Sequence, residues 1–272
     1  MISAKVIADS TCQDTRLTTL SLVMPMTLIR EFNTHRAFSR NASSSRAVPV
    51  SKTLQEVTEN PVVPIYWGKN QAGMQSYQEI AEEDKNKALQ IWLEARDSAV
   101  KYASQLAELG VHKQYSNLLL DPFAWIRVVV SSTEWDNFFT LRLHETAKPE
   151  IRLLAQEMHK AMTLSEPVSR PVYNAKNITP DMWHLPYISE EERGHHSVTD
   201  LVRMSTARCA RVSYNKHDST PPTLEEDLKL AEMLLDQHPP HASPAEHQAV
   251  FTGEGKNANF TGWASYRFLL DL

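Results

Sequence analysis

The sequence predicts an α+β fold in which helices dominate. Apolar side chains recur at helical spacing over residues 75–109, where we expect one long helix or two, and Gly110 provides a C-terminal stop. Residues 4–7 and 17–23 are short runs of β-branched and apolar residues, which are typical of strands. No long flexible linker separates these segments. We therefore expect a single domain that spans residues 1–272.

The other elements follow in chain order. Pro25 is expected to open a short helix, and the polar, Ser-rich residues 38–51 are expected to form a loop. Residues 124–130 fit either a strand or the apolar face of a helix. Helices are predicted, the first of them with Thr133 as its N-cap, over residues 133–143, 146–162, 201–214 and 224–235. Irregular structure, a loop and an aromatic, apolar stretch are expected, in that order, over residues 167–186, 238–259 and 260–270.

Composition and charge exclude several classes of protein. The chain has 28 Lys and Arg residues against 33 Asp and Glu, so its net charge is −5, which is unlike a general nucleic-acid coat or a polybasic membrane binder. Its 7 glycines form neither a G-x-G-x-x-G motif nor a Walker loop. Cys12 and Cys209 are far apart and indicate neither a disulfide framework nor a zinc site. They favour a reducing, cytoplasmic environment.

Targeting and membrane signals are not expected. The first ten residues lack a basic segment followed by an apolar one, so we predict no signal peptide. The longest apolar stretch, residues 20–29, is interrupted by Ser21, Pro25 and Thr27, and it is shorter than the roughly 20 residues of a bilayer span.

The strongest local signal is the segment from Thr34 to Arg46. It contains three arginines, one histidine, four serines and one asparagine in 13 residues. Arginine offers paired donors to phosphate oxygens, and serine hydroxyls and loop N–H groups add shorter hydrogen bonds. The composition therefore indicates a polyanion site, although a solvated Ser-rich loop fits the same residues.

This segment resembles the signature of the flavin-dependent thymidylate synthases (ThyX), R-H-R-x-x-S-x-N-E-x-S-x-R. The matching residues are His35, Arg36, Ser39, Asn41, Ser44 and Arg46. Thr34 and Ala42 stand where the common members carry Arg and Glu, and Glu31 stands where they carry Gln. The variant T-H-R…N-A-S-S-S-R-A is similar to the branch found in bacteriophages and some bacteria, and a phage-encoded protein would act in the host cytoplasm.

Two further segments carry the same resemblance. Residues 133–152 are similar to the family pattern N-F-x-x-L-R…A-Q-x-E-I-R. Residues 207–214 and 241–247 are similar to A-R-V-S-Y and H-x-S-P-F-E-H. In common members this last pair precedes the signature, whereas here it follows, so the motif order is expected to be permuted. The resemblance implies a helix-rich α+β domain with a small, mostly antiparallel sheet.

The resemblance also implies an activity, which is the reductive methylation of dUMP to dTMP. FAD would be the cofactor, methylenetetrahydrofolate the carbon donor and NADPH the reductant, and the flavin would carry the redox chemistry. Family members form homotetramers with active sites at subunit interfaces, so we expect a homotetramer.

Residue roles follow from the same resemblance. Arg142 matches the arginine that binds the pyrimidine and stabilises charge at O2 as N3 loses its proton. Nucleotide binding is expected from Arg142 together with Glu31, Thr34, Ser43, Ser44, Ser45 and Arg46, of which Ser44 and Arg46 match the phosphate grip. Flavin binding is expected from His35, Arg36, Asn137, His241 and Ser243.

Several alternatives stay open from the residues alone. Arg142 could be a surface arginine paired with Glu145, and Asn137 a polar residue of a helix face. Leu118 stands where the family has a nucleotide-binding arginine, so dCMP or UMP, or a hydroxymethyl product, are alternatives to dUMP methylation. A non-catalytic flavin or nucleotide binder is a further alternative, whereas the net charge opposes nucleic-acid binding. The spacing of His238, His241 and His247 lacks metal-site regularity, so we expect no metal.

Overall fold

The computed structural model describes residues 1–73, 75–212 and 222–270, and its centre is a five-stranded sheet in the order β3-β4-β2-β1-β5. β1 (Ser3–Cys12) and β2 (Thr15–Pro25) form an antiparallel hairpin. Its tight turn contains Gln13, whose φ of 50° lies in the left-handed region. β4 (Trp125–Ser132) pairs antiparallel with β2, and β3 (Ser39–Ala42) pairs antiparallel with β4. β5 (Val168–Ser169) adds a short parallel edge to β1.

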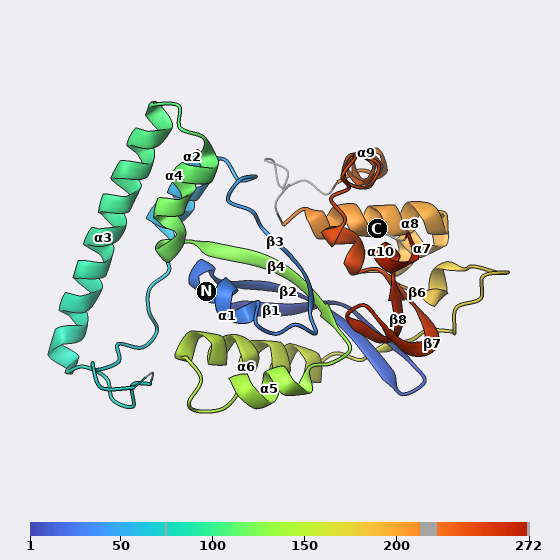
Figure 1. The fold of residues 1–272 in the computed structure, drawn as a ribbon, viewed down its shortest axis with the longest axis horizontal. Helices are drawn as coiled ribbons and strands as arrows, with labels where there is room; N and C mark the ends of the chain where they lie inside the picture. Colours follow the sequence, from blue (N-terminus) through green and yellow to red (C-terminus); the bar gives the residue numbers. More distant parts are fainter. Residues whose placement is uncertain (74, 213–221, 271–272) are drawn as a thin grey trace.

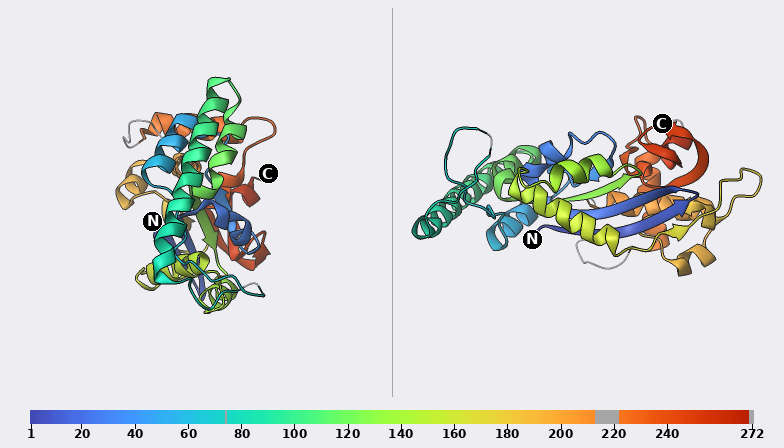
Figure 2. Two further views of the ribbon diagram at one scale, coloured as in Figure 1. Left: turned by 90° about the vertical axis from the view of Figure 1, so that its left-hand side faces the viewer. Right: turned by 90° about the horizontal axis from the view of Figure 1, so that it is seen from below.

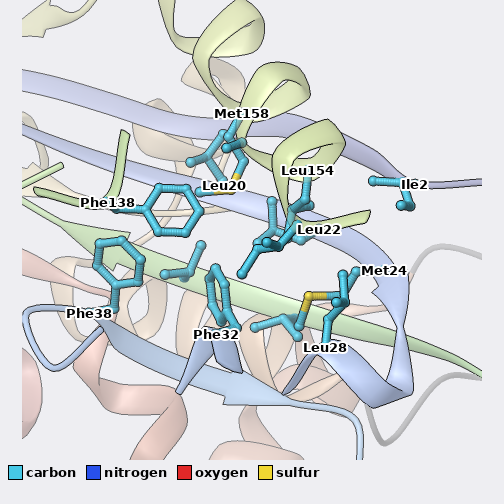
Figure 3. Packing of buried hydrophobic residues seen from close by; sticks show 14 of the residues in the cluster. Ile2, Leu20, Leu22, Met24, Leu28, Phe32, Phe38, Phe138, Leu154 and Met158 are labelled. Carbon is cyan, nitrogen blue, oxygen red and sulfur yellow. The ribbon is translucent and has the colours of Figure 1, made fainter. Parts of the chain in front are cut away.

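One face of this sheet carries the largest hydrophobic core. Successive side chains of a strand point to opposite faces, so Leu20, Leu22 and Met24 of β2 all point to the same side. α6 (Pro149–Thr163) and α5 (Asp136–Arg142) cover that side, and η1 (Met26–Leu28) with α1 (Ile29–Phe32) closes one end. Figure 3 shows how the aromatic and aliphatic side chains interlock here: Leu20, Leu22, Met24, Leu28, Phe32, Phe38, Phe138, Leu154 and Met158.

A helical lobe lies at one end of the sheet, on the left in Figure 1. It consists of α2 (Val50–Glu59), α3 (Glu82–Glu108), α4 (Lys113–Ser116) and η2 (Asn117–Phe123). These helices pack around a small core of Val57, Ala103, Leu120, Phe123 and Ala124. Within the described ranges, none of the helices, α3 included, is both long and apolar enough for a bilayer crossing.

The C-terminal part of the chain lies on the opposite side of the sheet from α5 and α6. The C-terminal part contains a three-stranded sheet of β6 (Trp183–His184), β7 (Ala249–Asn257) and β8 (Phe260–Ser265). Its helices are η3 (Pro180–Met182), α7 (Glu190–His195), α8 (Val198–Ala210), α9 (Leu224–Leu235), η4 (Ser243–Glu246) and α10 (Tyr266–Leu269). In Figure 1 its helices α8 and α9 are above the strands and β6, β7 and β8 are to the right, while α5 and α6 lie below. Figure 2 shows α6 in front of β1 and β2 when the molecule is seen from below.

The expected helix-rich α+β architecture with mostly antiparallel strands is confirmed, and helix α9 has the predicted bounds. The ambiguous residues 124–130 form strand β4. The prediction of a loop over residues 38–51 was wrong in part, because Ser39–Ala42 forms β3 by pairing with β4, and α2 begins at Val50. Strand β7 likewise lies within the predicted C-terminal loop.

The predicted N-cap of α5 was wrong as well. The helix begins at Asp136 after Trp135, with no side-chain cap. The hydroxyl of Thr133 instead accepts a hydrogen bond from the N–H of Thr261 in β8, at 3.0 Å. A contact with a strand more than a hundred residues away therefore uses the oxygen that local sequence assigns to the helix.

Candidate functional site

Strand β3 joins two segments that are distant in the chain. The side-chain amide of Asn41 donates to the carbonyl of Cys209 at 2.9 Å, and its oxygen accepts from the hydroxyl of Ser243 at 3.2 Å. Asn41 and Ser243 are 202 residues apart in the sequence. The segment from Thr34 to Arg46, called the Ser/Arg segment below, therefore lies against the end of α8 and against η4.

A cavity of about 700 Å³ opens at this junction. It is lined by Asn41, Ala42, Ser44, Arg46, Ala47, His112, Lys113, Gln114, Ala210, His241 and Pro244. Four of these side chains, one arginine, one lysine and two histidines, carry N–H donors, and among the residues that the structure describes the lining contains no Asp or Glu. An excess of donors over acceptors of this kind suits a phosphate or another anion.

The loop after β3 is held in place because side chains from α4 and η2 donate hydrogen bonds to its backbone carbonyls. The buried amide of Asn117 donates to the carbonyls of Ser45 at 2.8 Å and Val48 at 3.1 Å. The ammonium of Lys113 donates to the carbonyl of Ala47 at 2.9 Å. These contacts fix the loop against α4 and η2, so the segment is not a free, solvated loop.

Arg142 belongs to a second group, on the side of the sheet that α5 covers. Its guanidinium forms an ion pair with Glu31, and its Nε–H donates to Nε2 of His35 at 2.9 Å. Because arginine is only a donor, His35 Nε2 carries no proton. Burial, with the positive charges of Arg142 and Arg40 beside it, lowers the pKa of His35 to about 4. The histidine is therefore neutral at pH 7 and orients Arg142.

The two groups are neighbours along the chain but face different surroundings. Arg40 in β3 donates through Nη1 to the carbonyl of His35 at 3.0 Å, which ties the segment before β3 to the strand. Glu31, His35 and Arg142 do not line the 700 Å³ cavity. One chain thus presents a phosphate-compatible cavity and, separately, a positioned arginine.

Comparison with known proteins identifies the family. The sequence profile described as "thymidylate synthase complementing protein" matches residues 10–168. The chain belongs to this family. The matched range contains the signature segment and residues 133–152, and the segments at 207–214 and 241–247 lie after it.

Structural comparison supports the fold of this family member. The chain is similar to the UMP/dUMP methylase PolB from Streptomyces cacaoi bound with 5-Br dUMP, at 15% identity and a TM-score of 0.51, over 60% of this chain and 90% of that one. The same methylase bound with 5-Br UMP has 15% identity and a TM-score of 0.48, over 60% and 89% of the two chains. No protein of curated function matches the sequence.

Most of the predicted site residues of this family member fall into three places. Around the cavity lie Ser44, Arg46 and His241, with Ser243 directly behind Asn41. Around α1 and α5 lie Glu31, His35 and Arg142, and Arg142 contacts Glu31 rather than Glu145. Arg36 and Asn137 are exposed and, in the part of the chain that the structure describes, contact neither group, while Thr34 is exposed and donates to the carbonyl of Glu31 at 2.7 Å.

A narrower cavity of about 60 Å³ is bordered by the three consecutive serines Ser43, Ser44 and Ser45. Ser43 Oγ accepts from the N–H of Arg127 at 3.2 Å, and Ser43 N–H donates to the Arg127 carbonyl at 2.8 Å. Asp121 lines the same cavity, and burial raises the pKa of its carboxyl group. Ser43 therefore has a structural role in extending the β3–β4 pairing.

Sequence reasoning missed Lys113 and Asn117. Lys113 begins α4 and Asn117 begins η2, and Asn117 directly precedes Leu118, the position singled out for its lost arginine. The available signal was an asparagine followed by three leucines, because an amide that is buried with such residues needs hydrogen-bond partners. Of the A-R-V-S-Y match, Ser213 and Tyr214 lie outside the described residues, while Arg208 and Arg211 pair with the buried Asp227.

A buried hydrogen-bond chain anchors the end of the H-x-S-P segment. Ser10 Oγ contacts His184 Nδ1 at 2.9 Å, and His184 Nε2 contacts Thr19 Oγ1 at 2.7 Å. Thr19 contacts Ser131 at 2.6 Å, and Ser131 contacts His247 Nδ1 at 2.8 Å. Each hydroxyl has one proton, and the described partners of Thr19 and Ser131 all belong to this network, so both hydroxyl protons are used only when the bonds between the two histidines run in one direction throughout. The tautomers of His184 and His247 are thereby coupled.

Proposed function

We propose that this protein is a flavin-dependent thymidylate synthase that methylates dUMP at C5 to give dTMP. The observation that carries the proposal is the meeting of Ser44 and Arg46 with His241 at one basic cavity, although the two segments lie about 200 residues apart. Family membership and the fold shared with a UMP/dUMP methylase support methylation of a pyrimidine nucleotide. The carbon donor is methylenetetrahydrofolate and the reductant is NADPH.

The donor set of the cavity fits the phosphates of FAD as well as those of a nucleotide. Basic side chains and the Ser44 hydroxyl line it, with no carboxylate among the described residues, and the exposed amide of Asn137 offers a further polar contact to a flavin. His35, Arg36, Asn137, His241 and Ser243 would hold the cofactor. When bound, the flavin supplies the redox chemistry that reduces the transferred carbon.

The protein's own residues bind and polarise the nucleotide. Arg46 and Ser44 bind the 5′-phosphate. The other residues expected to contact the nucleotide are Glu31, Thr34, Ser43 and Ser45. Arg142 stabilises the negative charge that develops at O2 when N3 loses its proton, which makes C5 more nucleophilic. Its guanidinium is already oriented by Glu31 and His35, so little reorganisation is needed during the reaction.

Neither cysteine is suited to be the nucleophile of a covalent mechanism. Cys12 and Cys209 are both buried, and burial raises the pKa of each thiol. A reactive cysteine needs access and a lowered pKa, so the chain's chemistry is expected to proceed without an enzyme–nucleotide bond through sulfur.

A nucleotide panel tests the proposal. The purified protein is loaded with FAD and incubated with methylenetetrahydrofolate, NADPH and either dUMP, dCMP or UMP, and products are identified by mass. We expect flavin absorbance to co-elute with the protein and dTMP to form from dUMP. Colourless protein after gel filtration would contradict the flavin assignment, and methylation or hydroxymethylation of dCMP or UMP alone would replace the substrate. FAD and dUMP binding without turnover would identify a non-catalytic binder.

We propose the homotetramer as the active form, because the cavity and Arg142 are separate in one chain. Sedimentation at micromolar concentration tests this assembly, and a monomer with full activity would contradict it.

A further inference from the structure

We propose that Lys113 binds the nucleotide's phosphate and, through the same ammonium group, holds the loop that contains Ser44, Arg46 and Ala47 around this phosphate. This inference rests on the proposed function and adds a residue to the same site. The juxtaposition that carries it is Lys113 on α4, Ala47 in the loop and Arg46 at one cavity wall.

The cavity has a second cation although Leu118 replaces the nucleotide-binding arginine of the family. Leu118 is 52% exposed and does not line the cavity. Lys113, five residues earlier, does line it, together with Arg46. The positive charge that Leu118 cannot supply is therefore present on a neighbouring turn.

The ammonium of Lys113 has donors to spare. It carries three protons and uses one in the 2.9 Å hydrogen bond to the carbonyl of Ala47. Among the residues that the structure describes, no carboxylate forms an ion pair with it, in contrast to Lys85 and Lys148. Two donors and an uncompensated charge thus remain for phosphate oxygens at the cavity wall.

The position of Lys113 is restrained from both sides. Ala47 directly follows Arg46, and its own N–H donates to the carbonyl of Ser44 at 2.9 Å. Asn117, one turn after Lys113, binds the loop carbonyls on either side of Ala47. A ligand that draws Lys113 inward therefore also acts on the loop that carries Ser44 and Arg46.

Charge type separates the roles of the two cations. Arginine presents a planar fork to two phosphate oxygens, whereas lysine acts as a compact point charge. A dianionic phosphate monoester can engage both at once. A neutral nucleoside has nothing for Lys113 to bind.

Calorimetric titration of dUMP, deoxyuridine and FAD into wild type, Lys113→Met and Lys113→Arg tests the proposal. Lys113→Met retains much of the side-chain volume but loses the charge and the donors. We expect its dissociation constant for dUMP to rise roughly 10- to 100-fold, the range for hydrogen bonds to charged groups, and that for deoxyuridine to change less than about threefold. Lys113→Arg should recover most of the affinity. Lys160→Met, an exposed lysine on α6, is the matched control and should bind like wild type.

Each outcome decides one question. Unchanged dUMP affinity in Lys113→Met, or equal losses for dUMP and deoxyuridine, would overturn the phosphate contact. A loss of FAD affinity with dUMP affinity intact would assign the lysine to the cofactor instead and also overturn it. Failure of the wild type itself to bind dUMP would refute the proposed function, and the Lys113 proposal with it. Thermal melting of each variant establishes that it is folded.

Discussion

The protonation state of His35 determines how Arg142 is held. Its Nε2 accepts from Arg142, and its ring packs edge-on against Phe138 at 4.8 Å between centroids and stacks on Phe38. A proton on Nε2 would place two donors and two positive charges against each other. The neutral ring is therefore part of the geometry that aims the guanidinium.

This arrangement predicts acid sensitivity. His35 has a pKa of about 4 in the folded chain and 6.5 as its ordinary value, so between these pH values the unfolded state binds the proton that the folded state does not. The free energy of unfolding should therefore fall as pH drops from 6.5 towards 4, by up to about 1.4 kcal/mol per pH unit from this residue. Burial lowers the pKa of His184 and His247 as well, in the same direction.

Urea unfolding at pH 7.0, 5.5 and 4.5 measures this dependence. In His35→Gln the amide oxygen can still accept from Arg142 but does not titrate, so the dependence on pH should be shallower than in wild type. The same steepness in both proteins would mean that His35 is protonated while folded.

Arg142→Lys should lower turnover far more than stability. Lysine keeps the charge but cannot contact Glu31 and His35 through a planar fork while presenting further donors to a pyrimidine. We expect kcat to fall on the order of 10²–10³-fold, with a loss of roughly 1 kcal/mol in unfolding free energy. Arg152→Lys on α6, whose Nη1 donates to the carbonyl of Glu145, is the control and should keep its activity. Near wild-type turnover of Arg142→Lys would reduce Arg142 to a structural residue.

At the scale of elements, the buried series of hydrogen bonds that runs from Ser10 to His247 connects several parts of the fold. It crosses from β1 and β2 to β4, and reaches β6 and the segment after η4. These groups are fully or almost fully buried, so each lost partner leaves a polar atom without water. The C-terminal part is thus attached to the sheet by directional bonds as well as by apolar packing.

Removing the middle hydroxyl tests this attachment. Ser131→Ala leaves both Thr19 and His247 short of a partner, and we expect a loss of about 1–3 kcal/mol in unfolding free energy. Thr206→Val is the matched control, because the buried hydroxyl of Thr206 donates to the carbonyl of Val202 within its own helix. If chemical denaturation gives equal losses of unfolding free energy in the two variants, the buried hydrogen-bond series stabilises the fold no more than a local hydrogen bond does.

At the scale of the whole molecule, the separation of Arg142 from the cavity makes a prediction about assembly. If the active site takes Arg142 from one subunit and Arg46 from another, two inactive variants can complement each other. In a mixed oligomer of Arg142→Ala and Arg46→Ala chains, some sites receive both wild-type arginines.

Co-expression of the two variants under separate tags provides the measurement. With random pairing, about a quarter of two-chain sites should be intact, so the purified mixture should recover about a quarter of wild-type activity. Each variant expressed alone should be inactive. A mixture as inactive as its components would place both arginines of a site in the same chain.

The sequence by itself determined the family, the amphipathic helices and which basic and hydroxyl side chains the signature segment contains. The signature segment around Ser44 and Arg46 is local, and α3 and α9 have a hydrophobic period that is visible without any partner. Arg142 was singled out by its motif, but its partner was not. The alternative with Glu145 was local in sequence, whereas the observed partner, Glu31, is 111 residues away.

Only the tertiary structure decided which of these pieces meet. β3 has no strand-forming composition and exists because β4 offers it an unpaired edge. Asn41 meets Ser243, and Lys113 and Asn117 hold the loop, because the fold of the sheet and of the helical lobe brings them together. Such contacts leave no periodic trace in a polar segment: a hydrogen bond between distant residues depends on where two backbones cross, and this is set by the packing of the apolar cores around them.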